Sequence, residues 1–285
     1  MNSNRSANKA SPKKLKLKLF VLLILWVLAF FPLYPSLVET WLNHSNNSHG
    51  ILVPLISAYL IWKKREKLKL AVITNSNWGA IILVISMAVY VVSYAGAIAV
   101  ISRSMIVFSL IGLVLFTLGK SGFKLLVFPL FFLIFMVPIP DSIIGIVAFP
   151  LQLFATKISA IIIQALSIPV YREGNMLYFV ETQLETAEAC SGIRSIVSLT
   201  MISVLFAYLS DAGKIGKAAL VASAVPLALT GNFIRVSGTG ILAHFYGSKV
   251  ARGFLHEFSG LAVFGLGFMI LLIEYTLLNK IKAKR

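Results

Sequence analysis

The stretch LFVLLILWVLAFFPLYPSL, at residues 19–37, contains no charged residue and is long enough to cross a bilayer as one helix. Basic residues gather just before it: Arg5, Lys9, Lys13, Lys14, Lys16 and Lys18. A secretory signal peptide has the same order, but its apolar core is shorter and a small-residue cleavage site follows it. We therefore interpret this stretch as a first transmembrane helix that the protein retains.

Similar apolar runs continue to the end of the 285-residue chain. Hydrophobic residues make up 58% of the sequence, and charged residues only 13%, about half the share in a soluble domain. We predict an all-α, polytopic membrane bundle of about eight transmembrane helices. The predicted spans are 19–38, 50–62, 79–101, 104–118, 124–137, 191–210, 216–238 and 257–279. We expect a basic tail at 1–18, a single multi-span domain at 19–279, and a second basic tail at 280–285.

The net charge of +16 does not indicate nucleic-acid binding, because the positive charges lie in short clusters between apolar runs. These clusters are residues 5–18, residues 63–69, Lys120 with Lys124, Lys214 with Lys217, and residues 280–285. Such clusters mark cytoplasmic loops. The rule places both termini in the cytoplasm.

Whether the apolar stretch 142–168 crosses the membrane decides on which side the later basic clusters lie. If it crossed the membrane fully, the two basic clusters that follow it would lie outside. Pro150 interrupts it, and its polar residues share one helical face: Gln152, Thr156 and Ser159. We predict an interfacial or re-entrant helix on the outer side.

A polar segment, residues 169–189, follows this stretch. Glu173-Gly174-Asn175 is a turn signal between two short runs of β-forming residues. We predict a small outer hairpin that leads into Cys190, and this topology also brings Arg235 and His256 to the outer ends of spans.

Cys190 is the only cysteine, so the chain has no intrachain disulfide. It lies in Glu188-Ala-Cys-Ser-Gly-Ile-Arg194, where the hairpin meets a membrane helix. The helix dipole, together with Arg194 one turn further on, would lower the thiol pKa and favour a nucleophilic thiolate. The alternative is an inert cysteine that packs as a small apolar residue, with Arg194 extending to the interface.

Arg235, in Gly231-Asn-Phe-Ile-Arg235, lies near the outer end of an apolar span. A charge there costs several kcal/mol unless it is solvated or paired, so it marks a candidate site. Its guanidinium could stabilise an oxyanion, and Asn232 could donate a hydrogen bond beside it. The alternative is a structural ion pair with Glu188 or Glu257.

His256, in Phe254-Leu-His-Glu-Phe-Ser-Gly260, could carry protons between the thiol and a leaving amine. His244 competes for this role, although its aromatic neighbours fit interfacial packing better. His44 and His49 share one loop, but no histidine pair has metal-ligand spacing. We expect no metal and no other cofactor. A further alternative is a metal-dependent intramembrane hydrolase, and sensitivity to chelators would distinguish it from a thiol enzyme.

These motifs resemble those of the exosortase/archaeosortase family of membrane-embedded, cysteine-dependent protein-sorting enzymes. The resemblance covers roughly residues 40–275. It rests on the following segments: Ala189-Cys-Ser-Gly-Ile-Arg194, Asn232-Phe-Ile-Arg235, His256-Glu-Phe-Ser-Gly260, Ser48-His-Gly-Ile-Leu-Val-Pro54, Tyr59-Leu-Ile-Trp62 and Pro169-Val-Tyr-Arg-Glu-Gly174.

The resemblance implies that Cys190, Arg235 and His256 are catalytic; Ser259-Gly260 after His256 favours it over His244. It further implies a peptidase or transpeptidase in the bacterial cytoplasmic (inner) membrane, with its active site facing outward. Its partners would be exported proteins with a C-terminal Pro-Glu-Pro-type motif, a transmembrane helix and a basic tail, in bacteria that make exopolysaccharide. The alternative from another class is a non-enzymatic membrane component of exopolysaccharide assembly or transport. Many exosortases carry an additional C-terminal soluble domain, and this sequence ends at Arg285.

Overall fold

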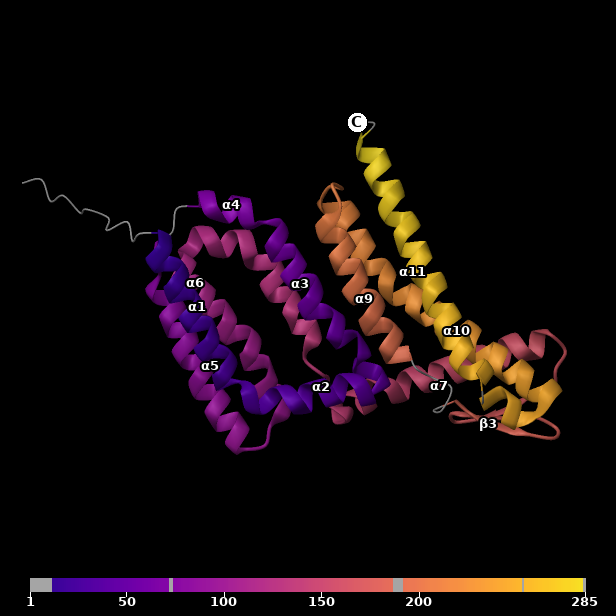
Figure 1. The fold of residues 1–285 in the computed structure, drawn as a ribbon. Helices are drawn as coiled ribbons and strands as arrows, with labels where there is room; N and C mark the ends of the chain where they lie inside the picture. Colours follow the sequence, from indigo (N-terminus) through magenta and orange to yellow (C-terminus); the bar gives the residue numbers. More distant parts are fainter. Residues whose placement is uncertain (1–11, 72–73, 187–191, 253, 284–285) are drawn as a thin grey trace, which may run out of the picture. The chain divides into compact units, whose positions relative to one another are not determined.

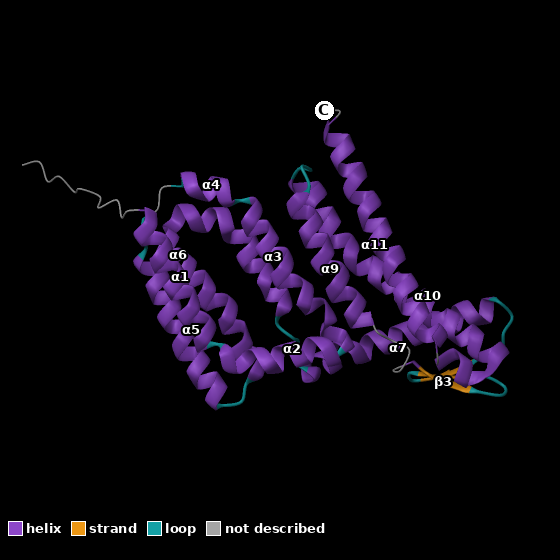
Figure 2. Ribbon diagram, viewed as in Figure 1, coloured by secondary structure: helices purple, strands orange, loops and turns teal. Residues whose placement is uncertain are grey.

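The computed structural model describes residues 12–71, 74–186, 192–252 and 254–283 (Figure 1). This part of the chain is mostly helical and contains one small sheet (Figure 2). The chain divides into two compact units, Met1–Pro138 and Ile139–Arg285. The all-α fold class is confirmed.

The first unit contains six α-helices and three short 3-10 helices among its described residues. In chain order they are α1 (Pro12–Ala29), η1 (Phe31–Leu33), α2 (Tyr34–Asn43), η2 (Ser45–Ile51), α3 (Leu52–Lys63), α4 (Arg65–Leu70), α5 (Asn77–Ala95), α6 (Ala99–Phe132) and η3 (Leu133–Met136). The predicted span 19–38 is bent by 46° between α1 and the helical segment Phe31–Asn43. Pro32, whose ring cannot continue an α-helix, lies at this bend.

Helix α6 contains a sharp internal bend at Gly119 (Figure 1). Its φ of 67° lies in the left-handed region, and a Cβ there would lie 1.8 Å from the carbonyl oxygen of Thr74, so only glycine fits. The apolar segment Ala99–Met136 has 38 residues, or about 57 Å of helix, nearly twice the hydrocarbon thickness. This length agrees with the two predicted spans 104–118 and 124–137, which are the arms on either side of the bend.

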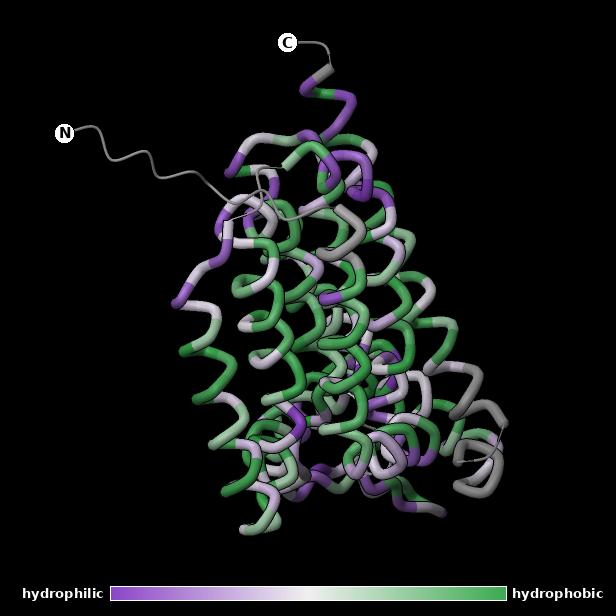
Figure 3. The backbone as a smooth tube through the Cα atoms, turned by 60° about the vertical axis from the view of Figure 1, so that its left-hand side comes forward, coloured by the Kyte–Doolittle hydropathy of each residue, from purple (hydrophilic) through white to green (hydrophobic). Residues whose placement is uncertain are grey.

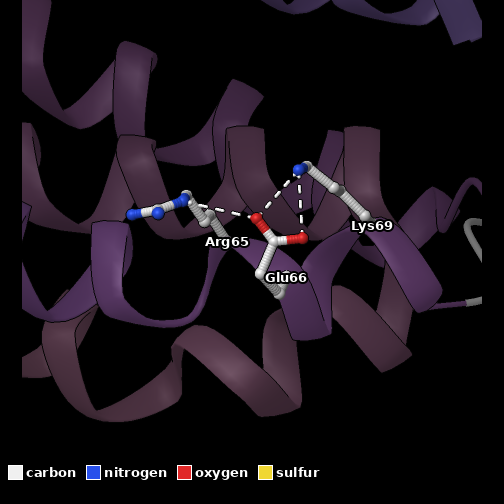
Figure 4. Close-up of polar contacts among 3 residues, drawn as sticks. All are labelled: Arg65, Glu66 and Lys69. Carbon is white, nitrogen blue, oxygen red and sulfur yellow. Dashed lines mark hydrogen bonds and ion pairs between the residues drawn. The ribbon is translucent and has the colours of Figure 1, made fainter.

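Helix α4 carries the basic cluster predicted at residues 63–69. Figure 4 shows Glu66 between two of its cations: Lys69 Nζ lies 2.8 Å from Glu66 Oε1, and Arg65 Nε lies 3.4 Å from it. The hydrogen bond from Lys69, followed by the two positive charges, holds the pKa of Glu66 below its ordinary value. The Arg65 guanidinium also lies 4.2 Å from the ring centroid of Trp62.

The second unit contains four described helices and the sheet. In chain order its helices and strands are α7 (Asp141–Ala165), β1 (Tyr171–Glu173), β2 (Met176–Tyr178), β3 (Gln183–Glu185), α9 (Gly192–Leu209), α10 (Lys214–Arg252) and α11 (Phe254–Ala283). The strands are antiparallel in the order β1-β2-β3, with Glu173 opposite Met176 and Met176 opposite Glu185. The predicted hairpin is therefore present, and a third strand extends it.

Two apolar cores hold this unit together. One joins the sheet to α7 and α10, through the buried side chains Ala160, Ile163, Ile168, Val170, Leu177, Phe179, Leu184 and Val236. The other lies among α9, α10 and α11, where Leu199, Ala224, Ala228 and Leu271 are buried. Helix α10 thus belongs to both cores, and it connects the sheet to the helix bundle.

Six described segments are long and apolar enough to span a membrane, or seven if the bent pair at the N-terminus counts as one span. They are Asn77–Ala95, Ala99–Met136, Ser142–Ala165, Gly192–Leu209, Lys214–Tyr246 and Ser259–Lys282. Hydrophobic residues follow the helices, and hydrophilic residues gather near their ends (Figure 3). The protein is a multi-pass membrane protein. The predicted number was about eight because α3, at 12 residues, and both arms of α6 were counted as spans, whereas α7 was not.

Helix α7 corresponds to the stretch 142–168, which we predicted to lie at the outer interface. Its length and hydropathy suit a span. Figure 1 shows it running across the direction of α9 and α11, within the same unit. The polar face of this helix does not contact the surroundings of the protein at Thr156 and Ser159, because both side chains are fully buried against the rest of the unit. The interfacial position remains a prediction.

Candidate functional site

The register of helices α9, α10 and α11 is fixed by glycines at their contacts. A Cβ on Gly231 of α10 would lie 2.6 Å from Val263 Cγ1 of α11, and one on Gly267 of α11 would lie 3.0 Å from Leu199 Cδ1 of α9. Small residues allow membrane helices to pack this closely. The contacts determine which residues of the three helices share one level.

Arg235 of α10 lies at one of these contacts. Its side chain is only 7% exposed, and a Cβ built on Gly260 of α11 would lie 3.4 Å from its Cζ, 3.5 Å from Nη2 and 3.6 Å from Nη1. The guanidinium therefore lies against bare helix backbone. Asn232, three residues earlier on α10, is 4% exposed. Both residues have interaction partners, as expected for buried polar groups.

The beginning of α9 lies at the same level. Gly192, its first residue, precedes Leu199 by two turns, just as Gly260 precedes Gly267 by two turns on α11. Since helices rise equally per residue, Gly192 and Gly260 lie at about the same height along the two helices. Arg194, half-buried in the first turn of α9, also has an interaction partner.

Two of the three predicted catalytic side chains are not described. Cys190 and Glu188 lie outside the described residues, immediately before α9. His256 lies in the first turn of α11, four residues before Gly260 and therefore on the same helix face, although its side chain is outside the described set. For Cys190 and His256 the structure thus gives only their neighbours along the chain.

His244, the competing histidine, has aromatic neighbours in the structure. Its ring centroid lies 6.0 Å from that of Phe179, at the end of the sheet, and 4.9 Å from that of Phe245. It follows Arg235 by nine residues, or about 13 Å of helix. These contacts agree with the packing role that the sequence favoured for it.

Sequence reasoning missed the contacts that α7 makes beside the site. The polar face of α7 was visible in the sequence, but we attributed it to the membrane interface. Thr156 Oγ1 lies 2.6 Å from Thr186 Oγ1, just after β3, and Ser159 Oγ donates to the Phe233 carbonyl oxygen of α10 at 3.5 Å. No sequence spacing links these residues.

Among the described side chains, no three from His, Cys, Asp and Glu lie close enough together to hold a metal ion. In the first unit, His49 of η2 is partly buried, which lowers its pKa below the ordinary value, while a backbone hydrogen bond with Phe135 acts in the opposite direction.

The arrangement around Arg235 suits anion recognition. A buried guanidinium presents several N–H donors, and Asn232 adds an amide one turn away. In a site that excludes water, such donors stabilise negative charge far more strongly than in bulk solvent.

Comparison with known proteins gives one family. A model of the transmembrane exosortase family matches residues 41–273, which is most of the chain and includes every element of the second unit in whole or in part. No curated protein matches, and no solved structure matches. The chain therefore belongs to the transmembrane exosortase family.

Proposed function

We propose that this protein is a membrane-embedded cysteine peptidase and transpeptidase, which cleaves C-terminal sorting signals from exported proteins and transfers those proteins to an acceptor. Membership of the exosortase family supports a sorting role. The observation that carries the proposal is the contact between Arg235 and Gly260. It joins the segment Asn232–Arg235 to the segment His256–Gly260, which are far apart in the sequence.

In this proposal Cys190 is the nucleophile. Its thiolate attacks the carbonyl carbon of the scissile peptide bond, and the carbonyl oxygen becomes an oxyanion that Arg235 stabilises, with Asn232 as a second donor. His256 takes the thiol proton and gives it to the leaving amine, so that the C-terminal tail departs as a neutral amine. The exported protein then remains on Cys190 as a thioester, which an acceptor amine or water resolves.

Arg194 and Glu188 would have supporting roles. A guanidinium one turn into α9, together with the dipole of that helix, favours a thiolate at the helix start. Glu188, two residues before Cys190, could balance the charge of either arginine. His244 would remain a packing residue.

The level of the site suits a substrate that is anchored by its own transmembrane helix. The beginning of α9, the beginning of α11 and the sheet lie at the same end of the second unit (Figure 1). The positive-inside pattern assigns this end to the outer face, with both termini in the cytoplasm. A helix-anchored protein would present a Pro-Glu-Pro-type motif at that depth, with its basic tail on the cytoplasmic side.

A processing assay in cells tests the proposal. A reporter with a C-terminal Pro-Glu-Pro-type signal, or a candidate substrate from the same organism, is expressed with wild type or with Cys190→Ala at matched membrane levels. We expect the tail to be removed only with wild type. Processing that persists in Cys190→Ala contradicts the thiol mechanism, and equal absence of processing with every natural substrate favours the non-enzymatic role.

A further inference from the structure

Two buried hydroxyls of α7 contact the segments that lead to both proposed catalytic elements. Thr156 and Ser159 lie on one face of the helix, and both are 0% exposed. Thr156 Oγ1 lies 2.6 Å from Thr186 Oγ1, and Ser159 Oγ donates to the Phe233 carbonyl oxygen at 3.5 Å. Thr186 precedes Cys190 by four residues, and Phe233 precedes Arg235 by two.

Thr186 has contacts on two sides, with the turn at Asn175 and with α7. The Thr186 hydroxyl donates to the Asn175 carbonyl oxygen, and the Thr186 backbone N–H donates to the same oxygen at 2.9 Å. The two hydroxyls have two protons for three contacts, with the Asn175 carbonyl oxygen, with the Gln152 carbonyl oxygen and with each other, so either threonine can donate in the contact between them. The chain residue that follows β3 is therefore tied both to the turn at Asn175 and to α7.

The apolar core alone would not fix the position of Thr186. Leu177 and Leu184 of the sheet already pack against Ile163 of α7, and all three are at most 1% exposed. Apolar contacts are non-directional, whereas a buried hydrogen bond specifies the position and orientation of both partners. Without the hydroxyl pair the sheet would still pack on α7, but the position of Thr186, where the chain leaves the sheet, would be less well defined.

We propose that Thr156 and Thr186 form a latch that positions the segment leading into Cys190, and that Thr156 is therefore a positioning residue for the thiol. The proposal rests on the proposed role of Cys190 as nucleophile. It assigns to α7 the function of a rigid support for the site, since the same helix face also bonds to the α10 backbone beside Arg235. Reacting groups that are misplaced by about 1 Å lose much of their rate.

The chain offers a matched control for this latch. Thr117 of α6 is also buried, at 1% exposed, and its hydroxyl donates to the Leu113 carbonyl oxygen of its own helix at 2.7 Å. Thr156 makes the same kind of bond to the Gln152 carbonyl oxygen, at 2.6 Å, in addition to its contact with Thr186. Valine at either position removes a mid-helix hydroxyl at nearly constant volume, but only Thr156→Val removes a bond between segments.

The experiment compares Thr156→Val, Thr156→Ser and Thr117→Val in the full-length protein in membranes. The first measurement is the processing rate against reporter level. The second is the pH dependence of alkylation at Cys190, which is the only thiol in the chain. We expect Thr156→Val to lower the maximal rate about tenfold, with little change in the reporter level at half-maximal rate. We expect its alkylation midpoint to rise toward the ordinary thiol value of about 8.5.

Thr156→Ser, which retains the hydroxyl, should have the wild-type processing rate and the wild-type alkylation midpoint. Thr117→Val should also match wild type in both. The latch is overturned if Thr156→Val and Thr117→Val agree in both measurements. If wild type processes no reporter, the proposed function fails and the alkylation midpoint alone decides the latch. If Thr156→Val does not accumulate in membranes, Thr186→Val removes the other hydroxyl and is measured in its place.

Discussion

Arg103 and Arg235 both lie within long apolar helices of this protein, and their surroundings differ. Arg103 of α6, in the first unit, is partly exposed, and its Nη2 lies 3.3 Å from Thr40 Oγ1 and 3.4 Å from Ser36 Oγ of α2. Arg235 of α10, in the second unit, is 7% exposed and lies against the backbone at Gly260. Arg103 joins one helix to another through hydroxyls, whereas Arg235 faces a position without a side chain. The comparison teaches that two charges in apolar helices can have different neighbours, hydroxyls in one case and bare backbone in the other.

Replacing each arginine should separate the two cases most clearly. We expect Arg235→Gln to lower processing by about 100-fold or more, because one lost oxyanion donor costs that much in other enzymes. Arg103→Gln, which removes a charge of the same kind from another apolar helix, should change processing less than about threefold. The processing assay at matched membrane levels measures both, and equal losses would mean that Arg235 is also only an anchor.

Substitutions at Gly260 should show whether the Arg235 guanidinium needs a position without a side chain beside it. Gly260→Leu would push atoms into the space that Arg235 occupies, and we expect about a tenfold loss of processing. Gly260→Ala should be mild, because its Cβ would meet Cζ at 3.4 Å, an ordinary contact distance. Gly265→Leu is the control on the same helix, since a Cβ there meets nothing within 4 Å. Loss in Gly265→Leu as well would indicate a general defect in α11.

The hydroxyl contacts of Arg103 should matter for stability instead of activity. Thr40→Val removes the shortest of the three contacts that Arg103 makes with α2, and it leaves the side-chain volume nearly unchanged. We expect the free energy of unfolding to fall by about 0.5–1 kcal/mol, because the contact is partly exposed to its surroundings. Thermal unfolding in detergent measures this change. An unchanged midpoint would show that the contact of Arg103 with Thr40 does not stabilise the packing of α2 on α6.

The smallest effect concerns His49, a group in the first unit whose charge can change. Its folded pKa is lowered by burial, so the unfolded chain binds protons more readily, and stability falls as pH drops below the unfolded value of about 6.5. We expect His49→Gln to reduce this loss. Unfolding midpoints in detergent at pH 7.5 and at pH 5.5 would measure it, and an identical pH dependence in the variant would contradict the assignment.

The sequence predicted the helical class, the hairpin and Arg235 as a site candidate, because apolar runs, turn residues and an isolated charge are local signals. It did not predict the bend at Gly119 as part of one helix, since nothing in residues 104–137 shows that Thr74 lies against that glycine. The contact of Gly260 with Arg235 and the Thr156–Thr186 pair also escaped prediction. Both depend on the register of segments that are 25 or more residues apart.

The bend at Gly119 also concerns how the protein reaches the bilayer during synthesis. The two arms of α6 are joined at Gly119 by a corner with no extended loop between them. The arms should enter the lipid together as one helical hairpin. A residue with a Cβ at position 119 would meet the Thr74 carbonyl and adopt a disfavoured backbone conformation. Its first consequence would be a defect in biogenesis, before any step of catalysis is reached.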